Sequence, residues 1–487
     1  MALGLSGDRF ARPPLTVRPV GSTRRISTPV QIAVTGAAAV GVAVLPPTLS
    51  IAAIVGLAAF LVFVSQPLLG VYALLFSVPF QSIRNLQAGS LNVTVTEVLV
   101  FCLVLAWGGR AITEGRFNSG YLPWLGPLLL YGAVLGLSLT QATDFAGSFK
   151  ELLKWAELLF AYVVGMSVIG SRKDLRRLLI ATFAAVVAEA LVGFGQTVLH
   201  AGPSSFARGG FLRAAGTFEQ PNPFAGYLNM CLPMAVTLLA YRAFPRRPMW
   251  LVVAICGGGV LISESRGGLL ASIGALLVIS VVALPRSRAL IGLGGIVLLG
   301  VLAGGAIGLV PSQVTEPLAA QFGVANIDVA NPSPANWAVA ERLAHVQAGL
   351  SMWADHPVLG VGIGNYPKQY PHYKVITTGD IWGNALGHAH NYYINIGAEA
   401  GIIGLVALVI LLAGGVVICA RAYSRATAPL ERAVALGGLG VMVTIVIHNM
   451  FDDIFVHGME VQMALVLVAA SRVAVGFRPE QEVERVG

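Results

Sequence analysis

The sequence predicts an all-α polytopic membrane protein with about 12–14 transmembrane helices and a large extracytoplasmic loop containing amphipathic helices. Three observations lead to this fold class. The chain of 487 residues is 56% hydrophobic and only 11% charged, whereas an ordinary soluble domain carries roughly a quarter charged residues. Apolar segments of spanning length recur almost from end to end. Lysine and arginine gather in alternate intervals between these segments, as they do in cytoplasmic loops.

The apolar segments define the order of the elements. They follow a basic, proline-containing stretch that is typical of a retained signal anchor, because so many spans come after it. The first eleven lie at residues 30–45, 48–65, 67–80, 92–109, 122–140, 152–170, 176–199, 222–241, 249–263, 267–284 and 288–310. The last three lie at residues 393–420, 430–449 and 457–473. The third and ninth segments are short, which leaves the total at about twelve to fourteen.

This pattern divides the chain into five parts. Residues 1–29 form a cytoplasmic N-terminal segment, and residues 30–310 contain the first eleven transmembrane helices. Residues 311–390 form an extracytoplasmic loop with the catalytic motif at its end. Residues 391–473 contain the last three helices, and residues 474–487 form a cytoplasmic tail. Inside the loop, Leu343, Val346, Leu350 and Trp353 recur at helical spacing, which predicts an amphipathic helix packed on the bundle or on the lipid surface.

The charged residues predict the orientation of the spans. With the N-terminus inside, both termini are cytoplasmic and most of the net charge of +8 falls in inner loops. The basic pI is therefore explained by membrane orientation, and no motif for binding nucleic acid is present. The inner clusters are Arg110 and Arg116; Arg172, Lys173, Arg176 and Arg177; Arg242, Arg246 and Arg247; Arg286 and Arg288; and Arg421, Arg425 and Arg432.

The same orientation collects the titratable groups on the outer face, so we expect the chemistry to take place outside the cytoplasm. ATP and nucleotide sugars are absent from that side. The outer groups are His200, His345, His356, His372, His388, His390, His448 and His457, with Lys150, Arg208, Arg213 and Arg266.

The four cysteines, Cys102, Cys231, Cys256 and Cys419, lie in or beside apolar runs without CxxC spacing, which indicates buried thiols.

Four stretches of the chain resemble one family of bacterial envelope enzymes. They are RAAGTFEQPNPFAGYL at 213–228, SESRGG at 263–268, RLAHVQAGLSMWADHPVLGVGIGNY beginning at Arg342, and HAHNYYINIGAEAGIIGL beginning at His388. Together they resemble the signature region of the O-antigen ligase and O-antigen polymerase family. The resemblance covers roughly residues 150–470.

The resemblance implies a membrane-embedded glycosyltransferase that works at the outer face of the bacterial cytoplasmic membrane. Its donor is a glycan linked to polyprenyl (undecaprenyl) diphosphate, and its acceptor is a hydroxyl on lipid A core, on another glycan or on a protein. The reaction uses no nucleotide, no cofactor and no metal.

A diphosphate at the membrane edge needs cations that bind oxygen atoms bidentately, and arginine does this better than lysine. Arg266 is the main candidate, because it stands between two apolar runs and precedes two glycines and a helix N-terminus. A snorkelling interfacial arginine is the alternative. Arg213 is the second candidate ligand. Arg208 and Lys150 are further candidates, although a solvated loop charge also explains Arg208.

The two histidines of HAHN fit proton transfer, since imidazole titrates near neutral pH. His390 matches the histidine of the family's HN motif, which Asn391 completes, and is assigned as the general base that accepts the proton of the attacking hydroxyl. His388 is a supporting residue or a solvated loop imidazole, and Glu399 orients His390 or closes a helix contact. An HxH pair could also hold Zn²⁺ with Asp355, Asp380 or Glu399, but their spacing gives no support.

Three other functions remain open at the level of sequence. A polymerase would use the same donor and base but extend the glycan itself. A secondary transporter of the bicarbonate type would place ionisable groups at mid-span, where Glu157 is the nearest example. A non-catalytic envelope scaffold would not depend on His390 or Arg266.

Overall fold

The computed structural model describes residues 47–81, 86–88, 91–114, 120–208, 210–283, 294–295, 329, 337–375 and 387–478. The chain divides into two units, residues 1–57 and residues 58–487. Within the first unit the described residues belong to α2 (Pro47–Ser65), a largely apolar helix whose last eight residues are counted in the second unit. The predicted span at 30–45 and nearly all of that at 288–310 lie outside the described residues.

The second unit is built from helices, as the sequence predicts. They are α3 (Pro67–Phe80), α4 (Val95–Glu114), α5 (Leu125–Ser138), α6 (Phe145–Val168), α7 (Arg172–Leu199), α8 (Pro221–Asn229), α9 (Leu232–Ala240), α10 (Arg246–Ile262), α11 (Arg266–Ala283), α14 (Trp337–Asp355), α15 (Tyr366–Tyr373), α16 (Tyr392–Arg425), α17 (Pro429–His448) and α18 (Met459–Val475). Two short 3-10 turns, Leu139–Gln141 and Ser204–Phe206, and two hairpins interrupt them. The hairpins pair β1 (Leu86–Ala88) with β2 (Leu91–Val93) and β3 (Ala207–Arg208) with β4 (Phe211–Leu212).

The fold is therefore that of an all-α polytopic membrane protein. Among the described residues, six helical segments are long and apolar enough to cross a membrane, and three shorter apolar helices accompany them. The long segments are Val95–Thr113, Arg172–Leu199, Pro221–Ala240, Arg266–Ala283, Tyr392–Arg425 and Pro429–His448. Many leucine, isoleucine, valine and phenylalanine side chains on these helices are exposed, as expected for surfaces that face lipid.

The predicted span at 222–241 is divided into two helices. α8 ends at Asn229 and α9 begins at Leu232, with Pro233 in its first turn. Proline has no N–H and its ring clashes with the carbonyl four residues earlier, so one continuous helix cannot form here. The buried polar side chain at the break is satisfied, because Asn229 Nδ2 donates to Gly268 O and Asn229 Oδ1 accepts from Ser272 Oγ.

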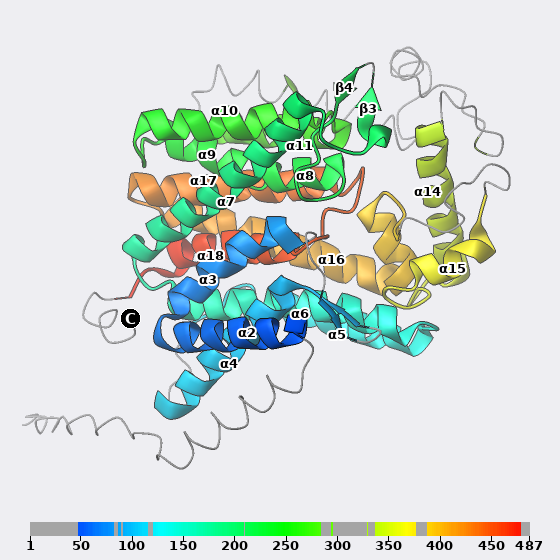
Figure 1. The fold of residues 1–487 in the computed structure, drawn as a ribbon, viewed down its shortest axis with the longest axis horizontal. Helices are drawn as coiled ribbons and strands as arrows, with labels where there is room; N and C mark the ends of the chain where they lie inside the picture. Colours follow the sequence, from blue (N-terminus) through cyan, green and yellow to red (C-terminus); the bar gives the residue numbers. More distant parts are fainter. Residues whose placement is uncertain are drawn as a thin grey trace, which may run out of the picture. The chain divides into compact units, whose positions relative to one another are not determined.

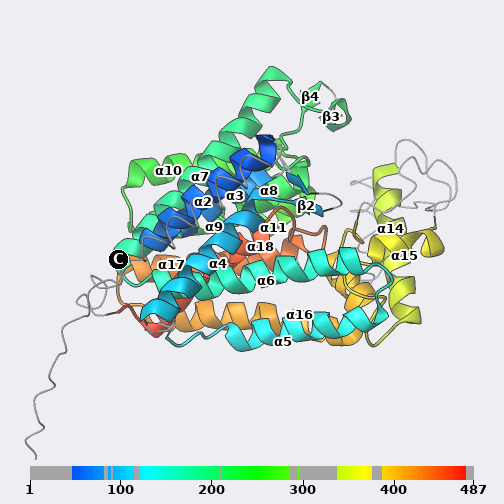
Figure 2. The same cartoon turned by 60° about the horizontal axis from the view of Figure 1, so that its bottom comes forward.

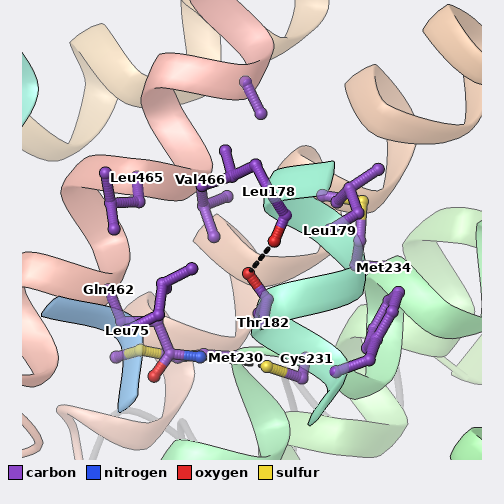
Figure 3. Close-up of a pocket in the computed structure, with 12 residues that line it drawn as sticks. Leu75, Leu178, Leu179, Thr182, Met230, Cys231, Met234, Gln462, Leu465 and Val466 are labelled. Atoms are coloured by element: carbon purple, nitrogen blue, oxygen red, sulfur yellow. Dashed lines mark hydrogen bonds between the residues drawn. The ribbon is translucent and has the colours of Figure 1, made fainter. Parts of the chain in front are cut away.

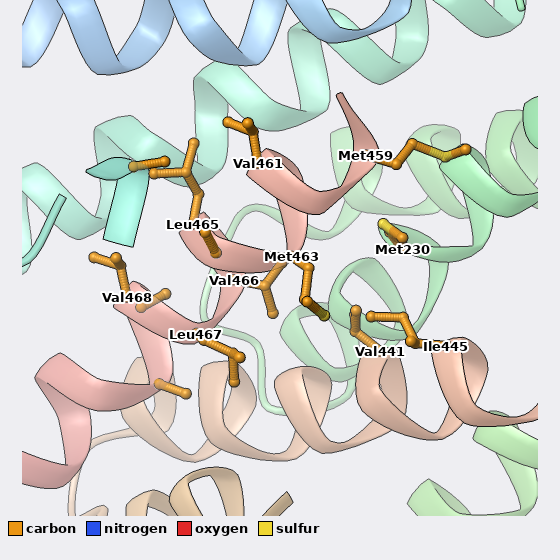
Figure 4. Close-up of a cluster of buried hydrophobic side chains, with 14 of the residues drawn as sticks. Met230, Val441, Ile445, Met459, Val461, Met463, Leu465, Val466, Leu467 and Val468 are labelled. Carbon is orange, nitrogen blue, oxygen red and sulfur yellow. The ribbon is translucent and has the colours of Figure 1, made fainter. Parts of the chain in front are cut away.

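α18 lies at the centre of the core and is buried on every face from Met459 to Ala474. It packs against α6, α16 and α17, so it is covered by helices from distant parts of the chain. Figure 4 shows Met463, Leu467 and their neighbours on α18 facing Val441 and Ile445 of α17. Apolar residues occupy most positions on all faces of α18, as expected for a helix inside a bundle.

One enclosed space beside this core is too small for a substrate. Its lining includes Leu75, Leu178, Met234, Gln462 and Leu465 (Figure 3). Its volume is about 20 Å³. That volume accommodates about one water molecule. It is therefore a packing defect and not a binding site.

The helix ends separate into two groups, as the predicted topology requires. At one end, Arg172 at the start of α7 bonds Glu431 near the start of α17, and Tyr241 after α9 meets Tyr423 near the end of α16. At the other end, Lys154 of α6 donates to Phe455 O in the segment between α17 and α18. The helix ends that carry the arginine clusters were predicted to be inner, and those that carry the histidines were predicted to be outer. The two groups thus lie at opposite ends of the helices. The side of the membrane on which each end lies stays a prediction.

The predicted helix in the loop insertion is present as α14, but its buried face is only partly the one expected. Leu343 and Leu350 are 39% and 45% exposed. The buried stripe is instead Ala340, Ala344, Ala348 and Met352, at intervals of four residues. α14 approaches α16 closely at Gly397 of α16. A Cβ at that glycine would collide with the Trp353 ring of α14.

Candidate active site

The loop insertion is held against α16 by main-chain hydrogen bonds. Val361 N donates to Ala398 O (2.8 Å), Gly362 N to Glu399 O (2.9 Å) and Ile402 N to Pro357 O (2.9 Å). These carbonyls and amides are accessible because α16 is interrupted at Gly401, whose φ of 65° and ψ of −166° are open essentially only to glycine. A Cβ there would collide with the Val358 carbonyl. Figures 1 and 2 show α14 and α15 beside the N-terminal end of α16.

The HAHN loop lies directly before α16 and is fixed by its polar neighbours. Asn391 caps the helix, accepting from Tyr393 N and Ile394 N at 3.1 Å, and donates to Met450 O. Ala389 N donates to Asn395 Oδ1, and Asn395 Nδ2 donates to Glu399. Glu399 also accepts from Tyr366 N at 2.8 Å. Glu399 therefore supports the loop through Asn395, and it does not contact His390.

His390 stands between two other imidazoles and one carboxylate. Its ring stacks on that of His345 from α14, with centroids 5.3 Å apart and planes 7° apart. His388 meets it edge-on at 4.7 Å. The φ of His390 is +52°, an uncommon left-handed value that turns its side chain back toward the segment after α17. The side chain is only 9% exposed.

Asp452 connects the parts of this cluster. Its Oδ1 lies 3.4 Å from His390 Nδ1 and 3.6 Å from His388 Nε2. Its Oδ2 accepts a hydrogen bond of 2.6 Å from Asn222 Nδ2 at the start of α8. The carboxylate thus has both histidines on one oxygen and an amide on the other.

The contact between His390 and Asp452 is longer than a formed hydrogen bond. Among the described residues, neither ring nitrogen of His390 has a hydrogen-bond partner, although the ring is buried. Catalytic hydrogen bonds are often long before substrate binds. This geometry leaves His390 able to exchange a proton with a bound group.

The charges at the site favour a neutral histidine beside an ionised aspartate. Burial lowers the pKa of His390 below its usual value, and Asp452 partly opposes the shift. Burial alone would raise the pKa of Asp452, but the two histidines and Arg342 hold it well below its usual range. At neutral pH the imidazole is therefore free to accept a proton, and the carboxylate is charged to stabilise the imidazolium.

The two arginines favoured by the sequence converge on one turn. Arg213 Nε donates to Ser263 O at 2.8 Å and its Nη2 reaches Glu264 O at 3.5 Å, in the turn between α10 and α11. Arg266 is the first residue of α11 and is exposed.

A chain of contacts connects this turn with His390. Gly267, next to Arg266, packs against His448 and Phe451, and Asp452 follows Phe451 in the chain. Arg213 and Arg266 thus lie at the same end of the bundle as His390.

Arg342 is a further arginine that the sequence reading did not single out. It projects from α14 one turn before His345 and is exposed. It lies on the helix whose His345 stacks on His390, and its positive charge helps to lower the pKa of both His390 and Asp452. Arg342 is the first residue of the RLAHVQAG stretch. Its spacing of three residues from His345 on a helix is a sequence signal that would have indicated it.

The remaining predicted residues are less closely involved. Lys150 is exposed on α6, and Arg208 lies in β3. Lys154, one turn after Lys150, is paired with Glu151 at 2.5 Å. Asp355 accepts from Tyr373 Oη far along α14, and Asp380 lies outside the described residues.

The loop that begins at Arg213 is held by two polar side chains of α7. Glu189 accepts from Thr217 N at 2.7 Å and from Thr217 Oγ1 at 2.9 Å. Gln196 accepts from Gly216 N and donates to Gly216 O. These contacts fix the approach to Asn222, which in turn holds Asp452.

Among the described residues, His388, His390 and Asp452 form a group whose nitrogen and oxygen atoms lie within 4.8 Å of one another. The carboxylate that completes this group is Asp452, not one of the three weighed from sequence. However, His388 Nδ1 accepts the His390 amide at 3.1 Å, which places the proton of neutral His388 on Nε2, facing Asp452. A metal would need the lone pair of that nitrogen, so the arrangement fits hydrogen bonding better than zinc ligation.

Fold and site together define a polytopic α-helical membrane protein with a histidine–aspartate centre and several arginines at one end of its bundle. Residues 251–409 match the family model described as O-antigen ligase, and this match supports an assignment to the O-antigen ligase family. The matched residues include Arg266, Arg342 and His390, whereas Arg213 and Asp452 lie outside them. The match supports an enzyme of glycosyltransferase or ligase type in a bacterial membrane. No curated protein matches the chain.

Proposed function

We propose that this chain transfers a glycan from a polyprenyl diphosphate donor to an acceptor hydroxyl at the outer face of the bacterial cytoplasmic membrane. The observation that carries the proposal is the buried pair of His390 and Asp452, 3.4 Å apart, at the bundle end that also bears Arg213, Arg266 and Arg342. One base and several phosphate-binding cations are the groups that this reaction needs.

In the proposed step the acceptor oxygen forms a bond to the anomeric carbon of the donor sugar. The bond from that carbon to the diphosphate oxygen breaks, and its electron pair leaves with polyprenyl diphosphate. The acceptor proton passes to His390. Asp452 stabilises the resulting imidazolium and keeps the ring in place, while Asn222 holds Asp452. General-base catalysis of this kind typically contributes about 10²- to 10⁴-fold in rate.

The arginines act on the leaving group. Arg266 and Arg213 share one turn, so both can meet the same diphosphate. Arg342 approaches from α14 on the side of His390 and Asp452. The N-terminus of α11 adds its amides and the positive end of its dipole. These charges are fixed before reaction, which makes stabilisation of the departing diphosphate effective.

The test is transfer by the purified full-length chain, supplied with polyprenyl diphosphate-linked glycan, candidate acceptors and a metal chelator. We expect His390→Ala to lower the rate by about 10²- to 10⁴-fold. Arg266→Ala and Asp452→Asn should also lower it. His372→Ala is the matched control, because His372 is exposed on α15, and its rate should equal that of the parent.

Three outcomes would contradict parts of the proposal. Full transfer by the His390→Ala and Arg266→Ala variants would remove the assigned site. Transfer that stops with chelator and returns with zinc would overturn metal independence. Uptake of labelled bicarbonate by vesicles containing the protein, without any transfer, would favour a transporter. The acceptor distinguishes a ligase from a polymerase. Transfer to lipid A core or to a protein indicates a ligase, and transfer to a second donor glycan indicates a polymerase.

A further inference from the structure

A second pocket lies at the end of the helices that is remote from His390. Its volume is about 660 Å³, within the range of about 300–1,000 Å³ that is common for ligand sites. Its lining includes Arg425, the last residue of α16, whose first residue follows the HAHN loop. At about 1.5 Å per residue, the 24 residues of α16 that follow the interruption at Gly401 place Arg425 roughly 36 Å beyond it. The lining residues are Arg172, Arg425, Glu431 and residues 473–478.

The pocket carries more positive than negative charge. Three arginines line it, Arg172, Arg425 and Arg478, against one carboxylate, Glu431. That carboxylate is already engaged, because it accepts from Arg172 Nε at 2.8 Å and from the amides of Thr427 and Ala428. Among these lining residues the arginines exceed the carboxylate by two positive charges, which favours an anionic ligand.

A fourth arginine lies just beneath the pocket. Arg472 is 4% exposed, and among the described residues its Nε and Nη2 have no hydrogen-bond partner. Its charge and that of Arg478 are close enough to repel each other. A buried guanidinium with unmade hydrogen bonds is costly, so an anion nearby would stabilise this end of α18.

The arginines are held in position and mixed with apolar groups. Arg425 Nη1 donates to Ala474 O at 2.8 Å, and the Arg172 guanidinium lies 5.4 Å from the centre of the Phe477 ring. Planar guanidinium groups match the oxygens of a phosphate. Val473, Val475 and Phe477 line the same pocket. A free phosphate would gain nothing from these apolar side chains, whereas a lipid would.

We propose that this pocket binds the phosphate of an anionic phospholipid headgroup. Basic pockets between transmembrane helices at the membrane surface commonly bind such headgroups. The predicted topology places this end in the cytoplasm, where anionic lipids supply the counter-charge. The proposal does not depend on glycan transfer, and either can fail without the other.

The experiment is native mass spectrometry of the full-length protein in detergent, after exchange with dioleoylphosphatidylglycerol or with dioleoylphosphatidylcholine. We expect the parent to retain one phosphatidylglycerol more strongly than phosphatidylcholine. Arg425→Gln should weaken this retention by about fivefold. Arg478→Gln is a second variant. Because Arg478 lies outside the helices, this substitution should disturb folding less. Arg421→Gln is the matched control, since Arg421 is exposed one turn earlier on α16 and does not line the pocket.

Equal retention of phosphatidylglycerol by the parent and by both pocket variants would overturn the proposal. So would equal loss in the Arg421→Gln control, because that result would show a general effect of surface charge. A parallel arm adds inorganic phosphate and follows thermal stability. Stabilisation by phosphate alone, without selective retention of phosphatidylglycerol, would assign the pocket to a free anion.

Discussion

Asn365 connects the loop insertion to the turn between α5 and α6, and its replacement by alanine tests how the insertion is held over the site. The side chain is fully buried. Its Oδ1 accepts from Asp144 N at 2.7 Å and from Thr143 N at 2.9 Å. Its Nδ2 donates to Ser148 Oγ at 2.8 Å and to Ile363 O at 3.0 Å.

The cost of Asn365→Ala follows from the groups that lose their partners. Ser148 Oγ retains its bonds to Asp144 O and Ile363 O, so it stays satisfied. The amides of Thr143 and Asp144 lose their acceptor. An unsatisfied buried donor costs about 1–3 kcal/mol, and both amides are partly accessible to water, which favours the lower half of that range. The local opening free energy should therefore fall by about 2–4 kcal/mol.

Hydrogen exchange measures this opening directly. The amides of Val361 and Gly362, which bond α16, should exchange roughly 30- to 1,000-fold faster in the Asn365→Ala variant. Gln369→Ala is the matched control, because Gln369 also bonds Thr143 but through an exposed side chain. Its effect should stay within about 0.5 kcal/mol. Unchanged exchange in Asn365→Ala, or an equal change in the control, would refute this account of how the insertion is held.

Two further predictions concern the loops around the site. Gly216→Ala should destabilise the protein by about 2–5 kcal/mol, because φ is +57° and a Cβ would collide with Glu189 Oε1. Gly210→Ala is the control. Its φ is +86° but a Cβ would meet open space, so it should cost only about 1 kcal/mol. Thermal unfolding in detergent compares the two, and equal losses would contradict the collision. His457 is predicted to weaken the fold in acid, since burial lowers its pKa below 6.5 and Glu219 only partly opposes this. The unfolded chain then binds the proton more readily, so stability falls as pH drops below about 6.5 toward the lowered pKa. The parent should lose more thermal stability between about pH 7.5 and 5.5 than His457→Asn, and identical pH profiles would show that His457 contributes nothing.

The sequence predicted the helices well because hydropathy over a spanning length is a local property. The boundaries of α3, α10, α11 and α17 lie within a few residues of the apolar segments that predict them. The division between α8 and α9 was not predicted, although Pro233 is a local signal for it. The buried face of α14 was predicted only in part. Trp353 packs against Gly397 of α16 as an apolar stripe would, but Leu343 and Leu350 are exposed and alanines face inward.

The sequence by itself determined the membrane class, the separation of basic and histidine-bearing helix ends, and the family motifs that led to His390 and Arg266. Only the tertiary structure decided that Asp452 lies beside His390, that Asn222 holds Asp452, and that His345 of α14 stacks on His390. The physical reason is that apolar length and charge are read over neighbouring residues. A hydrogen-bonded site instead joins side chains from helix ends far apart in the chain, and no local pattern records which ends meet.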